Sequence, residues 1–427
     1  MSERERIIAL LNQSHSPYQV VENLVNLFKG EFRIEKESNL TSLKAGDRFC
    51  LTRNQTSFAA VRLPKKAPKA FKIVATHNDS PTFKLKPNPL IQNKGVVQLN
   101  VEPYGGMLMA PWFDRPLSFA GRIVYEKDGV MASKLVDIDE DLLVIPNLCI
   151  HMNREANSGH AYNPAKELVP VFGVGEMKPE EFAPYLLEKA GLEGANLLSH
   201  DLFLYVREPA RIVGKDQSLL MSPRLDDLSS AYSAALAFEG APQAEDIAEI
   251  FISFDNEEVG SLTRQGAFSG FMKDLVDTVC EIYQFNALQK KEVIARSFLF
   301  SVDNAHAFHP NYPEISDKTT DVRINGGVVI KYNANAKYTS DAISAAYAKT
   351  IAKQAEVAYQ EYTNRSDMKG GGTLGNLSNA EISLNCADIG IAQWAMHSCM
   401  ETQGLADLDA MVKFLGAFYA SETLPLE

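Results

Sequence analysis

An apolar, β-branched run at residues 250–254, IFISF, ends abruptly in the acidic sequence DNEE at residues 255–258. The run predicts a buried strand. Adjacent carboxylates at the end of a buried strand repel one another and lose hydration, which is costly unless a cation offsets their charge. A chain that folds in this way therefore needs a positively charged partner where the strand ends.

Other apolar runs also end in side chains that can bind a metal ion. They are His77 and Asp79 after FKIVAT, Asp303 after SFLFSV, His397 after EISLNCADIG, and Asp226 and Asp227 in the turn SPRLDD before a predicted helix. In open α/β sheets, sites form in the crevice beyond the carboxyl ends of the strands. We therefore expect these side chains to converge.

Helix and strand patterns alternate through much of the chain, which predicts an α/β fold with a central mixed sheet flanked by helices. From about residue 90 to residue 207 the pattern changes to strands and turns rich in Gly and Pro. We predict a catalytic unit split between residues 1–89 and 208–427, with a mostly β insertion at 90–207.

Composition excludes several function classes. The 427 residues carry a formal charge of −12, which argues against nucleic-acid binding. No apolar run approaches the roughly 20 residues of a membrane span. The charged start MSERER differs from a secretory signal. The five cysteines are scattered and odd in number, so no disulfide framework is expected. These features predict a cytoplasmic protein that acts away from membranes.

The candidate ligands suit zinc or a similar divalent ion, because they combine two histidines with several carboxylates. Two ions with a shared carboxylate would explain why neighbouring acids are tolerated, with Glu258 on a metal and Glu257 facing a water. Each motif taken alone has a simpler explanation. DNEE is compatible with a solvated turn, RLDD with a helix N-cap, and His397 with a core histidine.

The combined motifs are more specific. THNDSP, SPRLDD, DNEEVGS, SVDNAHAFHPNY, GGTLG and AMHS occur in this order, along with YGGMLMAPWFDRPLSFAGR, IPNLCIHMNR and GGVVIKYNAN. In this the chain resembles the aspartyl aminopeptidase family of cocatalytic zinc peptidases, from the N-terminal helices almost to the C-terminus. The resemblance implies a hydrolase that removes N-terminal residues from peptides, with a preference for acidic ones (Asp or Glu).

The resemblance also implies a role for each candidate. His77 and Asp303 would hold one zinc ion, Glu258 and His397 the other, with Asp226 bridging, Glu257 as general base and Asp79 orienting His77. Two divalent ions would activate a water for attack on the peptide bond. Cobalt and manganese are alternatives to zinc because the ligand types also suit them.

Substrate contacts and assembly are implied in the same way. Lys331 and His151 match family positions near the substrate, and the histidine is supplied there by a neighbouring subunit. Similar proteins form dimers through the insertion and assemble into a closed homo-oligomer, typically a dodecamer. Three positions depart from the family pattern, namely Met400 in place of Arg, Asp227 in place of Asn and Gln19 in place of His.

Two alternatives remain open at the level of sequence. A related dizinc amidohydrolase, such as an aminoacylase or deacetylase, would use the same metal site on a capped amine. A catalytically silent scaffold would retain the fold without the chemistry. The presence of every proposed ligand and of Glu257 speaks against the scaffold.

Overall fold

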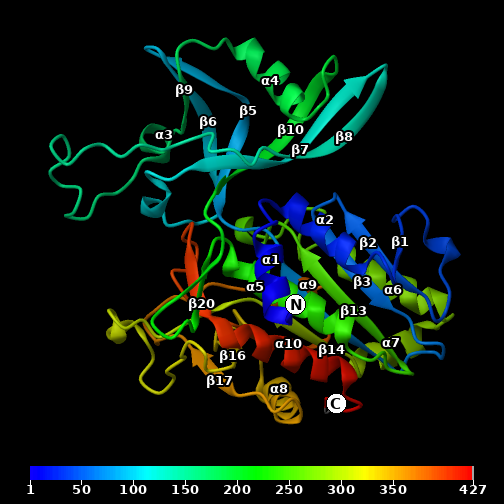
Figure 1. Ribbon diagram of the computed structural model, residues 1–427. Helices are drawn as coiled ribbons and strands as arrows, with labels where there is room; N and C mark the ends of the chain where they lie inside the picture. The colour runs from blue at the N-terminus through cyan, green and yellow to red at the C-terminus, as the bar shows by residue number, and fades with distance from the viewer. Residues whose placement is uncertain (426–427) are drawn as a thin grey trace.

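The computed structural model describes residues 1–425 and has the predicted mixed α/β architecture. Figure 1 shows two parts: a sheet formed by β5 to β10 lies apart from a larger body that holds both termini. Within residues 1–425, no helix combines the length and the apolar character that crossing a membrane requires. Every cysteine is free, as the scattered spacing predicts.

The large body is built on a nine-stranded mixed sheet, in the order β1-β2-β3-β13-β4-β14-β18-β16-β17. Its strands, in chain order, are β1 (Arg33–Ile34), β2 (Arg48–Arg53), β3 (Ser57–Arg62), β4 (Ala70–His77), β13 (Ile247–Phe254), β14 (Phe298–Val302), β16 (Val328–Tyr332), β17 (Tyr359–Thr363) and β18 (Asn385–Gly390). The three central strands, β13, β4 and β14, are parallel and fully buried. Such strands are continuous apolar runs because both of their faces are covered.

Helices cover both faces of this sheet. One face packs against α1 (Glu3–Leu11), α2 (Pro17–Phe28), α5 (Leu225–Gly240), α8 (Ala342–Gln354) and α10 (Leu405–Ala420). The other packs against α6 (Phe271–Ile282), α7 (Ala287–Ala295) and α9 (Leu374–Asn379). Successive residues of β4 alternate between the two cores, Ile73 on one side and Val74 on the other, as the pleat of a strand requires. The central mixed sheet flanked by helices is thus confirmed.

The register of the central strands brings the candidate site together. His77, the last residue of β4, pairs with Phe254, the last residue of β13. Asp303 follows directly after the end of β14, which runs parallel to β4 on its other side. Because these parallel strands finish at the same edge, the residues that follow them meet there.

A second, six-stranded antiparallel sheet has the order β8-β7-β10-β5-β6-β9. Its strands are β5 (Thr82–Asn93), β6 (Val96–Tyr104), β7 (Leu117–Lys127), β8 (Val130–Asp137), β9 (Val171–Val174) and β10 (Asn196–Val206). Two short helices, α3 (Pro164–Glu167) and α4 (Phe182–Lys189), accompany it. We call these strands and helices the insertion sheet. Its strands span 82–206, and the boundaries at 90 and 207 stay a prediction.

A third, small sheet lies beside the candidate site. Its strands are β11 (Arg211–Val213), β12 (Leu219–Ser222), β15 (Ala305–His306), β19 (Ala392–Trp394) and β20 (Glu401–Gly404), in the order β11-β12-β20-β19-β15. Asp226 lies at the start of α5, shortly after β12, and His397 lies in the loop that follows β19. This sheet therefore fixes the two candidate ligands that the large sheet does not.

A half-buried polar cluster joins the insertion sheet to α2. The Asp201 carboxylate on β10 accepts hydrogen bonds from Tyr18 Oη at 2.9 Å, from Lys84 Nζ at 2.9 Å and from a terminal nitrogen of Arg122 at 3.0 Å. Burial alone would raise the pKa of Asp201, but these donors outweigh burial and lower the pKa to about 2. The ionised carboxylate therefore stabilises the contact between the two parts of the chain.

We predict that Asp201→Asn lowers the melting temperature at neutral pH and that this deficit shrinks as the pH falls. A carboxylate whose pKa is lowered by folding stabilises the protein above its unfolded pKa, near 4, and loses that contribution toward pH 2. Thermal unfolding between pH 7 and pH 3 measures the effect. Glu245→Gln, which removes an exposed ion pair to Lys66, is the control and should change little at any pH. A deficit that is equal at all pH values would contradict the prediction.

Candidate functional site

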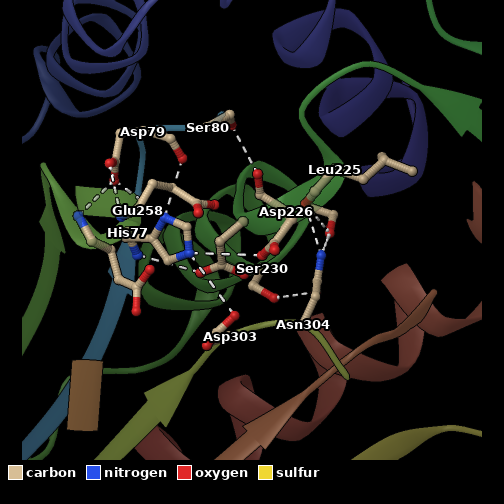
Figure 2. A network of polar contacts seen from close by, with 12 residues as sticks. His77, Asp79, Ser80, Leu225, Asp226, Ser230, Glu258, Asp303 and Asn304 are labelled. Carbon is tan, nitrogen blue, oxygen red and sulfur yellow. Dashed lines mark hydrogen bonds and ion pairs between the residues drawn. The ribbon is translucent and has the colours of Figure 1, made fainter. Parts of the chain in front are cut away.

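Three side chains from separate parts of the sequence meet beyond the end of β4 (Figure 2). Nε2 of His77 lies 3.7 Å from Oδ1 of Asp226 and 3.9 Å from Oδ1 of Asp303. All three residues are buried, and their ligand atoms lie within 4.8 Å of one another. This spacing is compatible with a single divalent ion held between them, because such ions bind nitrogen and oxygen ligands at about 2.0–2.2 Å.

A second group shares Asp226 with the first. Nε2 of His397 lies 3.3 Å from Oδ2 of Asp226 and 3.3 Å from Oε1 of Glu258. These three residues also bring their ligand atoms within 4.8 Å of one another. Since the two histidines face different oxygens of Asp226, its carboxylate lies between the two groups. The structure therefore brings the five sequence-predicted ligands close together. A third set of side chains, His77, Glu257 and Glu258, has the same spacing, so the assignment of ligands to each ion stays a prediction.

Two buried carboxylate oxygens of the site indicate that it can hold cations. Within residues 1–425, Oδ1 of Asp226 and Oε1 of Glu258 are buried and accept no hydrogen bond. Burying a carboxylate oxygen without a donor is costly. A divalent ion in each group would satisfy these oxygens and offset the repulsion between the acids. The donor set of nitrogen and oxygen atoms suits zinc.

The acids of the site repel one another and are shielded from water. Burial, reinforced by neighbouring carboxylates, raises the pKa of Glu257 to about 8, that of Glu258 to about 7 and that of Asp303 to about 6. Burial alone would lower the pKa of His397, but Asp226 and Glu258 outweigh it and raise this pKa to about 11. These shifts show that several carboxylates crowd one site and that a positive charge among them is favoured.

Asp79 holds the backbone of the acidic turn after β13. Its Oδ1 accepts from the N–H of Glu257 at 3.1 Å, and its Oδ2 accepts from the N–H of Glu258 at 3.2 Å. Nδ1 of His77 lies 3.1 Å from the carbonyl oxygen of Asp79 and 3.3 Å from its Oδ1. Nδ1 therefore faces acceptors, which directs Nε2 toward Asp226 and Asp303.

Backbone conformation adds to this positioning. Asn256, just before the two glutamates, has φ 61°, and His397 has φ 66°. Both lie in the left-handed region, which residues other than glycine seldom adopt. Such residues persist where the surrounding structure fixes them and cluster at functional sites.

The Glu257 side chain faces a cavity, whereas that of Glu258 is not among the residues that line it. Glu257 is half-buried and lines this cavity together with His77, Asp303 and His397. Among the described residues, no group donates a hydrogen bond to its carboxylate. A carboxylate with a raised pKa and free oxygens beside the cavity can accept a proton there.

The two predicted substrate contacts lie in different places. Lys331 lines the cavity but is only 2% exposed, and its Nζ donates to the carbonyl oxygens of Asp303 at 2.7 Å and Asn304 at 3.2 Å. The Lys331 ammonium is therefore shielded from water and held by the backbone beside the site. His151 is exposed in a turn and is not among the residues that line the cavity.

Sequence reasoning missed Glu401, at the start of β20. Its Oε2 accepts from the N–H of Asp226 at 2.9 Å and its Oε1 from the N–H of His397 at 2.6 Å. One buried carboxylate thus fixes the backbone of two candidate ligands that are far apart in sequence. The only available signal was an acidic residue at the start of a short strand, which is too common to single out.

The departures from the family pattern lie outside the two ligand groups. Met400 packs in the core of the insertion sheet at 6% exposure. Asp227 accepts a hydrogen bond from the N–H of His77 at 3.3 Å. Gln19 donates to the carbonyl oxygen of Val136 at 3.1 Å. None of the three supplies an atom to either group.

Comparisons with known proteins find related chains over nearly the whole length. The family model described as aminopeptidase I zinc metalloprotease (M18) matches residues 10–419. A protein of Pseudomonas aeruginosa named probable M18 family aminopeptidase 2 is 37% identical over 98% of each chain. A Clostridium acetobutylicum protein of the same name is 36% identical over 97% of this chain and 98% of its own.

Solved structures of the same kind have closely similar folds. A chain in the cryo-EM structure of the Ape4 and Nbr1 complex has a TM-score of 0.93 at 32% identity, covering 98% of this chain and 85% of its own. The structure described as the S. cerevesiae mApe1 dodecamer has a TM-score of 0.86 at 26% identity, covering 97% and 96% of the two chains.

Proposed function

The chain belongs to the aminopeptidase I zinc metalloprotease family (M18), and on this premise we propose that it removes acidic N-terminal residues from peptides with the help of two divalent metal ions. Its membership makes it a zinc aminopeptidase, a hydrolase of peptide bonds. The number of ions, the substrate preference and the role of each residue are the proposal. The observation that carries the two-ion site is the position of Asp226 between two groups of ligand atoms.

Five side chains would hold the metal ions. His77 and Asp303 would bind one ion, His397 and Glu258 the other, and Asp226 would bridge them. The support is the contact of Asp226 Oδ1 with one histidine and of Oδ2 with the other. Zinc fits this set of ligands, and cobalt and manganese are alternatives.

The residues around the ions would carry out the proton chemistry. When bound, divalent ions supply Lewis acidity that polarises a carbonyl group and lowers the pKa of water. The Glu257 carboxylate would take a proton from the attacking water and deliver it to the leaving amine. Asp79 would keep that carboxylate in place through the N–H of Glu257 and would hold the His77 ring.

A preference for acidic residues needs a positive charge beside the cavity. Among the described residues, Lys331 is the one lysine or arginine that lines it. Its ammonium lies 3.5 Å from Oδ2 of Asp303 and donates hydrogen bonds to two backbone carbonyl oxygens. We infer that Lys331 supplies the local positive potential for an acidic side chain while it also holds Asp303.

We further propose a homo-oligomer in the cytoplasm, with the insertion sheet at a dimer contact. One structural relative, the S. cerevesiae mApe1, is described as a dodecamer. The exposed turn of His151 would reach the cavity of a neighbouring subunit. Sedimentation measurements would decide this assembly, and a monomer at working concentrations would contradict it.

The central test is a panel of aminoacyl reporters. We expect hydrolysis of Asp and Glu reporters to exceed that of Leu, Ala and Lys reporters, and to require added zinc, cobalt or manganese after chelation. N-acetylated Asp and Glu reporters should resist the enzyme. Activity restricted to the acetylated forms would favour the aminoacylase or deacetylase alternative. A chain that binds no divalent ion and gains no activity on metal addition would favour the silent scaffold.

A further inference from the structure

A short segment of the insertion sheet reaches the cluster of metal-ligand candidates. It comprises Tyr104–Leu108, at the end of β6 and within the motif YGGML. Three contacts of this segment point to a role in positioning both groups of ligands.

The first contact acts on the Asp79 carboxylate. The Tyr104 hydroxyl donates to Oδ2 of Asp79 at 2.8 Å and accepts a hydrogen bond from Nδ2 of Asn256 at 2.8 Å. Asp79 in turn holds His77 and the backbone of the acidic turn. Because a carboxylate with one donor fewer has more freedom to rotate, loss of this hydroxyl would loosen all of these contacts.

The second contact acts on His397 directly. Nδ1 of His397 lies 2.6 Å from the carbonyl oxygen of Gly106, and the N–H of Leu108 donates to the carbonyl oxygen of His397 at 3.0 Å. A carbonyl oxygen only accepts, so Nδ1 carries the proton. When the ring is neutral, as a histidine that binds a metal must be, its lone pair is on Nε2, which faces Asp226 and Glu258 at 3.3 Å.

The third contact is steric. Gly105 has φ +74°, and a Cβ at this position would lie 3.1 Å from Cβ of Glu258 and 3.4 Å from its carbonyl oxygen. Only glycine combines this backbone conformation with so close an approach. The segment therefore contacts two candidate ligands, Glu258 and His397, and through Asp79 a third, His77.

We propose that Tyr104–Leu108 is a positioning segment through which the insertion sheet completes the metal centre, with Tyr104 as a positioning residue that acts through Asp79. The inference rests on the metal site of the proposed function and is independent of the substrate preference. It implies that the insertion sheet contributes to metal affinity in each chain, in addition to any contacts it makes between chains.

The first test compares Tyr104→Phe with Tyr205→Phe. Both variants remove a hydroxyl that donates to an aspartate, because Tyr205 donates to Oδ1 of Asp137 at 2.7 Å. Within residues 1–425, Asp137 contacts none of the metal-ligand candidates, so Tyr205→Phe controls for lost stability. The edge-to-face contact of Tyr104 with Phe203, at 5.4 Å between ring centroids, is retained by phenylalanine.

We expect Tyr104→Phe to raise the zinc dissociation constant roughly 10-fold, as removal of an outer partner of a metal ligand does. Its kcat should fall while KM changes little. Competition with a chromogenic chelator measures the affinity without any need for turnover. Tyr205→Phe should bind zinc as the wild type does. Equal zinc affinity and equal kcat in both variants and the wild type would overturn the proposal.

Gly105→Ala is the second variant, in case Tyr104→Phe fails to fold. Gly129→Ala is its control, because Gly129 has the same φ of +74° and a Cβ there meets no atom within 4 Å. Only Gly105→Ala should weaken zinc binding, and equal affinity in the two alanine variants would overturn the proposal. If the wild type binds zinc but cleaves no aminoacyl reporter, the proposed function fails, whereas the affinity comparison still decides the positioning role.

Discussion

Glu257→Gln is expected to lower kcat by roughly 10²-fold or more, as loss of a general base does, while the protein keeps its metal ions. Glutamine has nearly the same shape, but its amide cannot accept a proton from water and pass it on. The Glu257 side chain lines the cavity and lies outside the two proposed ligand groups that share Asp226. Steady-state kinetics with an acidic aminoacyl reporter, together with metal analysis of the same sample, measures both effects.

Glu258→Gln provides the matched comparison, because it makes the same chemical change one residue along the chain. Oε1 of Glu258 faces His397 at 3.3 Å, so this variant should lose metal as well as activity. The two variants thus separate proton transfer from metal binding. Turnover near the wild-type rate in Glu257→Gln would show that another group acts as the base.

The sequence contained the main elements of this site because parallel strands finish at a common edge. A buried apolar run precedes each of His77, Glu257 and Asp303. The observed register places β4 between β13 and β14. Strand ends are visible in a sequence as the point where apolar residues stop. The convergence of these residues could therefore be predicted before any coordinates.

Other features of the site depend on contacts that no local pattern encodes. Glu401 and Tyr104 touch the site through hydrogen bonds to residues 175 and 25 positions away. Lys331 can be buried because its ammonium donates to the carbonyl oxygens of Asp303 and Asn304. These contacts form only in the folded chain, so the sequence around Lys331 does not indicate them. The assignment of particular ligands to each ion came from family resemblance, since spacing alone leaves several groupings open.

Asp226→Ala is expected to abolish activity and to weaken binding at both metal positions together. Removing the carboxylate takes one oxygen from each group, leaving His77 and Asp303 on one side and His397 and Glu258 on the other. Protein sites for zinc normally supply three or more ligands, so neither remnant should retain its ion. The loss of affinity should exceed the about 10–100-fold that follows removal of an outer hydrogen-bond partner.

Asp303→Ala and His397→Ala are the controls that show whether Asp226 is a ligand of both ions. Each of these removes a ligand from one group alone, so each should release one ion and leave the other bound. Metal content after dialysis against a weak chelator distinguishes the three variants. If Asp226→Ala instead released a single ion, its carboxylate would belong to one group only. The acids around it would then need a different source of positive charge, because Glu257, Glu258 and Asp303 are all held in positions that raise their pKa.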